Sequence, residues 1–123
     1  MSFQIQYQQK RLSAADAIRV VMNGDTIVVP TAVGEPPALL TALSEARRDF
    51  RGVQVAQILP LRKFGYFDPE TAEHVRHTAY FFGGASRPGG QEGWVDFIPA
   101  NFSELPALLT RRLIGSDVVF SMA

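Results

Sequence analysis

Seven residues in two glycine-containing turns are the candidates for ligand binding in this sequence. They are Thr31, Gly34, Glu35 and Pro36 in the first turn, and Gly83, Gly84 and Arg87 in the second. Glycine permits backbone N–H groups to approach a ligand closely, and an arginine offers a fixed cation for a carboxylate or a phosphate. These residue types therefore favour recognition of a small anion. For the second turn, a flexible loop with a solvated arginine stays open as the alternative.

Other site chemistries find little support. The second turn is not followed by Gly-Lys-Ser/Thr, as a Walker loop requires, and it lacks the dinucleotide-binding glycine pattern. The chain has no cysteine, which excludes disulfides, thiol nucleophiles and cysteine metal sites. His74 and His77 are three residues apart and could share one face of a helix, but no carboxylate stands at ligand spacing. We therefore predict no metal site.

The first turn follows a strand and precedes a helix. Residues 26–29 form an uncharged β-branched run, which is typical of a strand covered on both faces. Pro30 has no N–H to donate and ends the strand, while Pro36 and Pro37 suit the first turn of a helix. In open α/β sheets, ligands bind where strands end and helices begin, because backbone donors and the positive end of the helix dipole converge there. The alternative is that this turn only connects two elements.

The remaining elements alternate between helix and strand. Periodicity and capping residues predict helices over 13–22 (N-cap Ser13), 36–46, 68–76 (N-cap Asp68) and 103–113 (N-cap Ser103), and strands over 52–58, 78–82, 94–98 and 118–122. Strand 52–58 alternates apolar and polar residues, which predicts a place nearer an edge of the sheet. Segment 94–98 allows an antiparallel pairing. We expect an open, mostly parallel α/β sheet with helices on both faces. We expect the sheet to be incomplete at the C-terminus, because residues 118–122 predict a buried strand with no closing helix after it.

Composition sets the broad class of protein. The chain has 123 residues, 46% of them hydrophobic, which suits one small domain over 1–123. Its 12 basic and 12 acidic residues balance and form no long run of one sign, so we expect no nucleic-acid or membrane partner. Met1 is followed by polar residues without the apolar core of a signal peptide, and a cytoplasmic location is expected.

Three stretches in order along the chain carry a family resemblance. They are Gly24-Asp-Thr-Ile-Val with Gly34-Glu-Pro-Pro-Ala-Leu-Leu, then Phe81-Phe-Gly-Gly84 with Arg87, and last Asp96-Phe-Ile-Pro-Ala-Asn-Phe-Ser-Glu-Leu-Pro106. Together they resemble the amino-terminal domain of the acetyl-CoA hydrolase/transferase family, which includes the 4-hydroxybutyrate and succinyl:acetate CoA-transferases. The resemblance implies a class I CoA-transferase fold of two α/β domains. It also implies covalent catalysis by a glutamate, with coenzyme A as substrate and no metal or redox cofactor.

The same resemblance places the nucleophilic glutamate in a carboxyl-terminal domain that these residues do not include, so we expect no catalytic residue in this chain. Glu35, which we expect to lie on an exposed turn, is the carboxylate that residue type alone would select as nucleophile. The resemblance instead assigns it a helix-start or pocket-lining role. The implied partners are an acyl-CoA, a small carboxylate, and the missing domain or a partner subunit, in a homo-oligomer. Hydrolysis of the acyl-CoA thioester, or a non-catalytic module that binds CoA or pairs with another chain, are the alternatives.

Overall fold

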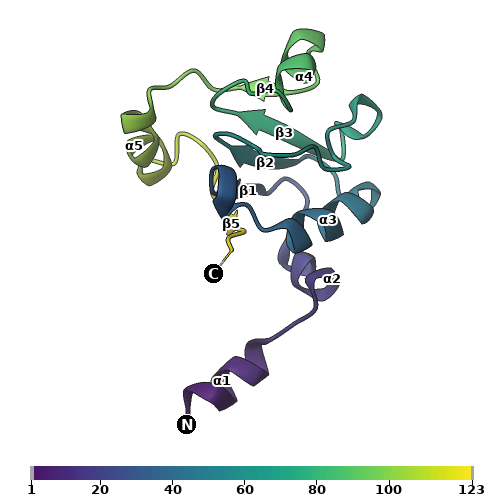
Figure 1. Ribbon diagram of the computed structural model, residues 1–123, viewed down its shortest axis with the longest axis vertical. Coiled ribbons are helices and arrows are strands. Elements are labelled where there is room, and N and C mark those ends of the chain that lie inside the picture. Colours follow the sequence, from purple (N-terminus) through teal and green to yellow (C-terminus); the bar gives the residue numbers. More distant parts are fainter. Residues whose placement is uncertain (1, 123) are drawn as a thin grey trace.

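A parallel five-stranded sheet forms the centre of the computed structural model, which describes residues 2–122 (Figure 1). The strands are β1 (Thr26–Val29), β2 (Val53–Gln57), β3 (Val75–Ala79), β4 (Asp96–Phe97) and β5 (Val118–Val119), in the spatial order β4-β3-β2-β1-β5. Every pair of neighbouring strands is parallel. The predicted open, mostly parallel sheet is therefore confirmed.

Helices lie on both faces of the sheet, as predicted. One face carries α2 (Ala14–Ala17), a 3-10 turn over Ile18–Val20, and α3 (Pro37–Glu45). Their apolar side chains pack against inward-facing strand residues and form the larger core. Ile18, Leu40 and Leu43 come from the helical segments, and Ile27, Val53, Val55 and Val75 come from the strands. The other face carries α5 (Leu105–Thr110), where Leu105 packs with Ala56 and Tyr80. Val55 and Ala56 are consecutive, so their side chains point to opposite faces.

Two predictions about strand placement are wrong. Segment 94–98 does not pair antiparallel, because the chain crosses from β3 to β4 through α4 (Arg87–Glu92) and arrives parallel, with Thr78 opposite Asp96. Strand β2 is the middle strand and not near an edge. The alternation of apolar and polar residues predicted one exposed face, but the polar side chain of Gln57 is buried and hydrogen-bonded.

Several element boundaries also differ from the prediction. The third strand runs over 75–79 in place of 78–82, and the helix expected over 68–76 is only a 3-10 turn over Pro69–Thr71, although Asp68 does cap it. Pairing of β3 with β2 along their whole lengths overrides the local capping signal. Helix α5 is shorter than 103–113, and Asn101, not Ser103, makes the capping box with Glu104. The expected helix 13–22 is only α2 and its 3-10 turn, with the predicted Ser13 cap present.

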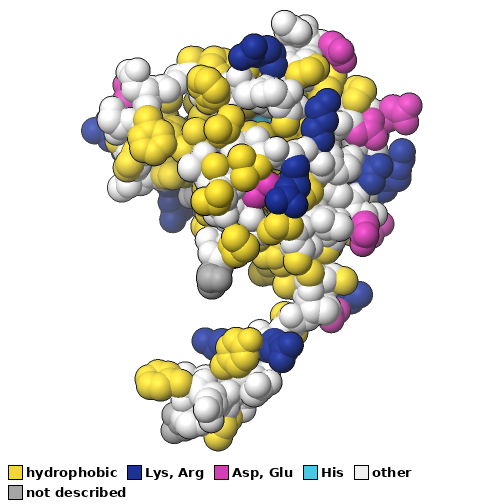
Figure 2. Space-filling model, viewed as in Figure 1, with side chains coloured by type: hydrophobic (Ala, Val, Ile, Leu, Met, Phe, Trp, Pro, Cys, Tyr) yellow, Lys and Arg dark blue, Asp and Glu magenta, His cyan; other side chains and the backbone are white. Residues whose placement is uncertain are grey.

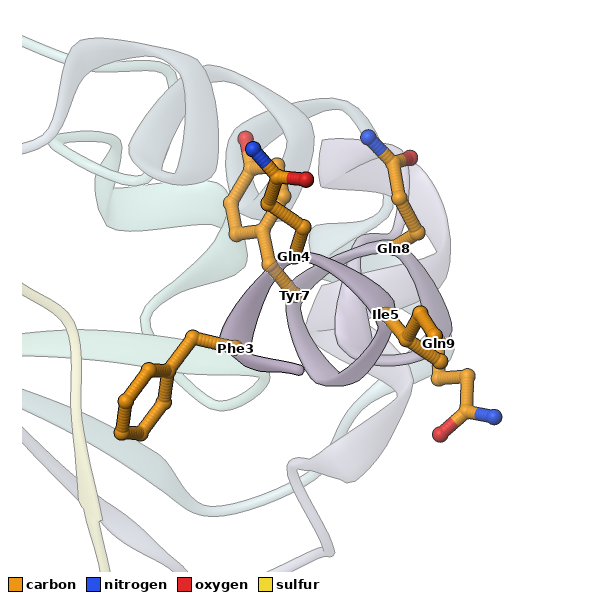
Figure 3. Close-up of a pocket in the computed structure, with 6 residues that line it drawn as sticks. All are labelled: Phe3, Gln4, Ile5, Tyr7, Gln8 and Gln9. Carbon is orange, nitrogen blue, oxygen red and sulfur yellow. The ribbon is translucent and has the colours of Figure 1, made fainter. Parts of the chain in front are cut away.

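An additional helix, α1 (Phe3–Lys10), extends away from the body of the domain (Figure 1). Its sequence has no apolar stripe, so periodicity did not predict it, and none of its residues is buried. Figure 3 shows six of its side chains pointing outward in different directions, so the surface hollow beside them does not enclose a ligand site. Among the helices of residues 2–122, none has the length and apolar character needed to span a bilayer.

Candidate functional site

The turns that follow β1, β2 and β3 meet at the carboxyl edge of the sheet. Leu59, just after β2, lies between the two turns that the sequence singled out. Its carbonyl oxygen accepts a hydrogen bond from the Ala32 N–H at 2.9 Å, and a Cβ placed on Gly83 would lie 2.6 Å from the Leu59 Cδ1 atom. The structure therefore brings the first and second turns together through a third segment, residues 58–62.

Glu35 is the centre of this arrangement. The turn was expected to expose it, but only 2% of the residue is accessible to solvent, so that expectation is wrong. One carboxylate oxygen accepts hydrogen bonds from Gln57 Nε2 at 3.1 Å and from the Leu61 N–H at 3.2 Å. The other oxygen accepts from Arg62 Nε at 3.1 Å. Glu35 is buried because these three donors replace the water that its charge would otherwise need.

The surroundings of this carboxylate are well defined. Gln57 Nε2 also donates to the Pro30 carbonyl at 3.0 Å, which fixes the end of β1 to the end of β2. The Arg62 side chain is 56% exposed and faces water on its other side. Tyr66 is buried nearby, and its pKa is raised far above the usual range, first by desolvation and second by the charge of Glu35. The phenol therefore stays neutral and adds no second negative charge beside Glu35.

The other residues of the first turn have distinct environments. Thr31 is exposed, and Ala32 after it has a positive φ of 50°, a conformation that a non-glycine residue adopts only when its neighbours enforce it. Gly34 packs against Pro30, where a Cβ would come within 2.8 Å of the proline Cβ, and its carbonyl accepts from the Met122 N–H. Pro36 is buried and is the N-cap of α3.

The second turn is more ordered than its glycines suggested. The Gly83 N–H is already used by Ser86 Oγ at 3.2 Å, whereas the space beside Gly84 is open. Arg87 is exposed at the start of α4 and donates to the Phe82 carbonyl at 3.3 Å. The alternative of a flexible loop is therefore wrong for residues 87–92, which are helical. Gly83, Gly84 and Arg87 lie at the same edge as the first turn, and their contact with a ligand stays a prediction.

The two histidines do not form a pair on a helix. His77 lies on β3 and is buried against the Phe67 ring at a centroid distance of 4.6 Å, and desolvation lowers its pKa to about 4. His74 Nδ1 lies 2.7 Å from the Phe50 carbonyl oxygen. Within residues 2–122, no group of three or more histidine, aspartate or glutamate side chains is arranged to hold a metal ion.

Sequence reasoning missed the end of β2 and the segment after it. Their contribution comes from Gln57, the last residue of β2, and from Leu59, Leu61 and Arg62; of these, Gln57, Leu61 and Arg62 donate hydrogen bonds to Glu35. The backbone N–H of Leu61 could not have been found from residue type. Gln57, a polar residue at an inward-facing position of a buried strand, was the one available signal.

The architecture defines the class of protein first: a parallel α/β domain whose candidate site lies at the carboxyl ends of its strands, where such domains bind ligands. Comparison with known proteins then gives the family. The model of the acetyl-CoA hydrolase/transferase N-terminal domain matches residues 1–119, and the chain belongs to this family.

Curated relatives agree with this assignment. The succinyl-CoA:cyclohexane-1-carboxylate CoA transferase of Geobacter metallireducens is 38% identical over 88% of this chain and 24% of its own length. The 4-hydroxybutyrate coenzyme A transferase of Clostridium kluyveri is 30% identical over 91% of this chain and 26% of its own length. The chain thus spans about a quarter of the curated relatives that it matches.

Two solved structures share the fold. RipA from Yersinia pestis superimposes with a TM-score of 0.83 at 24% identity, over 98% of this chain and 30% of its own. The 4-hydroxybutyrate CoA-transferase from Porphyromonas gingivalis gives a TM-score of 0.74 at 20% identity, over 98% of this chain and 26% of its own.

Proposed function

We propose that this chain supplies the amino-terminal wall of a CoA-transferase active site, which moves CoA from an acyl-CoA to a short carboxylic acid. Family membership and the names of the curated relatives support this proposal. The observation that carries it is the linkage at the carboxyl edge, where buried Glu35 ties the turn after β1 to the segment after β2. Such a linkage holds a ligand-facing edge rigid, as pre-organised binding requires.

The proposed reaction uses a glutamate outside this chain as the nucleophile. Its carboxylate attacks the acyl-CoA thioester carbonyl and expels the CoA thiolate, which leaves an acyl-glutamyl anhydride. The thiolate then attacks the glutamyl carbonyl of this anhydride, which releases the donor acid and forms a glutamyl-CoA thioester. The acceptor carboxylate repeats the two steps in reverse order and leaves as its CoA thioester. Splitting one difficult transfer into easier steps is the purpose of covalent catalysis.

Glu35 is unsuited to be that nucleophile. A nucleophilic carboxylate needs a lone pair that faces the substrate, but both oxygens of Glu35 accept hydrogen bonds within the domain and only 2% of the residue is accessible. We assign it a positioning role. The exposed residues Thr31, Gly84 and Arg87 are the ones that we expect to face the acyl group or the acceptor carboxylate, and Arg87 offers it a cation.

Whole-protein mass spectrometry tests the proposal. The whole protein that contains these residues is incubated with acyl-CoA and no acceptor, and its intact mass is measured. We expect a covalent CoA adduct on a glutamate outside residues 1–123, which an added acceptor acid removes with formation of a new acyl-CoA. If water alone discharges the adduct at the same rate, the protein is a thioester hydrolase. An adduct on Glu35, or turnover by residues 1–123 alone, would contradict the assignment.

A further inference from the structure

A second feature of the carboxyl edge is an apolar cavity on the face opposite Glu35. It has a volume of about 340 Å³ and lies between α5 and the sheet. Ala56 lies in its wall, and the next residue, Gln57, points to the Glu35 side of the sheet. The lining residues are Val28, Val29, Pro30, Thr31, Ala56, Ile58, Tyr80, Phe102, Leu105, Pro106 and Leu109.

The cavity opens at the proposed substrate edge. Thr31, Ile58, Tyr80 and Phe102 also line a neighbouring hollow of about 260 Å³, which reaches Leu59 between the two candidate turns. Phe102 is exposed. Figure 2 shows hydrophobic side chains gathered over α5 and the adjacent part of the sheet. A ligand at the edge can therefore extend into the cavity without crossing the sheet.

The lining favours an uncharged, mostly apolar group with one hydrogen-bond acceptor. Its polar side chains are Thr31 and Tyr80, and every other lining side chain is apolar. The Tyr80 hydroxyl is shielded from water and has no hydrogen-bond partner among the described residues. Burial raises the pKa of Tyr80, so the hydroxyl keeps its proton and can donate a hydrogen bond to a ligand oxygen.

The volume sets the size of the ligand. A dry apolar cavity of about 150 Å³ is large enough to bind benzene. The cavity here is more than twice that size and has room for an acyl chain of about six carbons, whereas an acetyl group would leave most of it empty.

We propose that this cavity binds the apolar part of the transferred acyl group and makes the site selective for acyl chains longer than acetyl, with the Tyr80 hydroxyl as a donor to the ligand. The proposal rests on the proposed function. It adds a substrate class, apolar acyl groups, and names the residues that select it.

Binding of two matched thioesters to the whole protein that contains these residues tests the proposal. N-acetyl-S-hexanoylcysteamine and its S-acetyl counterpart are titrated while the methyl NMR signals of Ile58, Leu105 and Leu109 are followed. The hexanoyl chain has four more methylenes than acetyl, and each fully buried methylene contributes about fourfold in affinity, so we expect the hexanoyl probe to bind up to about 250-fold more tightly. Leu109→Trp fills the cavity and should abolish that preference. Leu113→Trp is the matched control, because Leu113 is exposed and lies outside the lining.

Other outcomes would overturn the proposal. Equal affinity for both probes, or a preference that survives Leu109→Trp in a folded protein, excludes this cavity as the acyl site. Tyr80→Phe should lower the affinity for both probes by the same factor. If the affinities do not change, Tyr80 is not a donor to the ligand. A CoA-transfer assay on the whole protein separates the two claims. Transfer without hexanoyl preference refutes the cavity alone, while hexanoyl binding without transfer refutes the proposed function.

Discussion

Replacing Glu35 by alanine is the most informative perturbation of the carboxyl edge. The substitution removes the acceptor of three donors at once. Gln57 Nε2 is buried but keeps the Pro30 carbonyl as an acceptor, the Leu61 N–H is part-buried and loses its acceptor, and the exposed side of Arg62 can turn to water. A donor that is shielded from water and left unsatisfied costs about 1–3 kcal/mol, and an ion pair whose arginine is exposed to solvent contributes about 1 kcal/mol. We therefore expect Glu35→Ala to lower the free energy of unfolding by about 3 kcal/mol.

Urea denaturation at neutral pH measures this loss. Glu35→Gln keeps one acceptor oxygen and should lose about half as much. Glu45→Ala is the matched control, because Glu45 is exposed at the end of α3 and its removal should change stability by less than about 0.5 kcal/mol. Hydrogen exchange at the Leu61 amide should accelerate in Glu35→Ala and not in the control. A Glu35→Ala protein as stable as the control would refute the positioning role of this carboxylate.

Two further predictions concern His77 and Arg87. Because the folded-state pKa of His77 is lowered to about 4 from 6.5, the unfolded chain binds a proton between these pH values that the folded chain does not. Stability is therefore complete above pH 6.5 and falls by about 3 kcal/mol towards pH 4, and His77→Leu should remove that part of the slope in urea titrations. An unchanged slope would exclude His77 as its source. Arg87→Ala in the whole protein should raise the KM for the acceptor acid by up to about 10-fold without a change in melting temperature, since Arg87 is exposed, and unaltered kinetics would remove it from the site.

The sequence predicted the architecture of the sheet better than the boundaries of its individual strands. The β-branched run 26–29, the prolines after it and the alternation of elements were sufficient for a parallel sheet with helices on both faces. The start of β3 could not be predicted, because pairing with β2 draws Val75 and His77 into the sheet in spite of the upstream helix cap at Asp68.

The site was predicted only in part, for a physical reason. Glycine and proline mark where a turn lies, so the turns after β1 and β3 were found from residue type. The burial of Glu35 depends on donors that are 22 to 27 residues away, one of them a backbone N–H, and no local pattern reports such long-range pairing. The apolar cavity is likewise formed by residues from β1, β2, the segment after β3 and α5, which only the fold brings together.

Hydrogen–deuterium exchange on the whole protein, with and without acyl-CoA, tests most directly whether the carboxyl edge of this chain faces the substrate. We predict slower exchange on acyl-CoA binding in residues 31–34, 58–62 and 83–87, and unchanged exchange in α2 and in the amino-terminal ends of the strands. Protection confined to α2 and α3, or no protection anywhere in residues 2–122, would contradict the placement of the active-site wall.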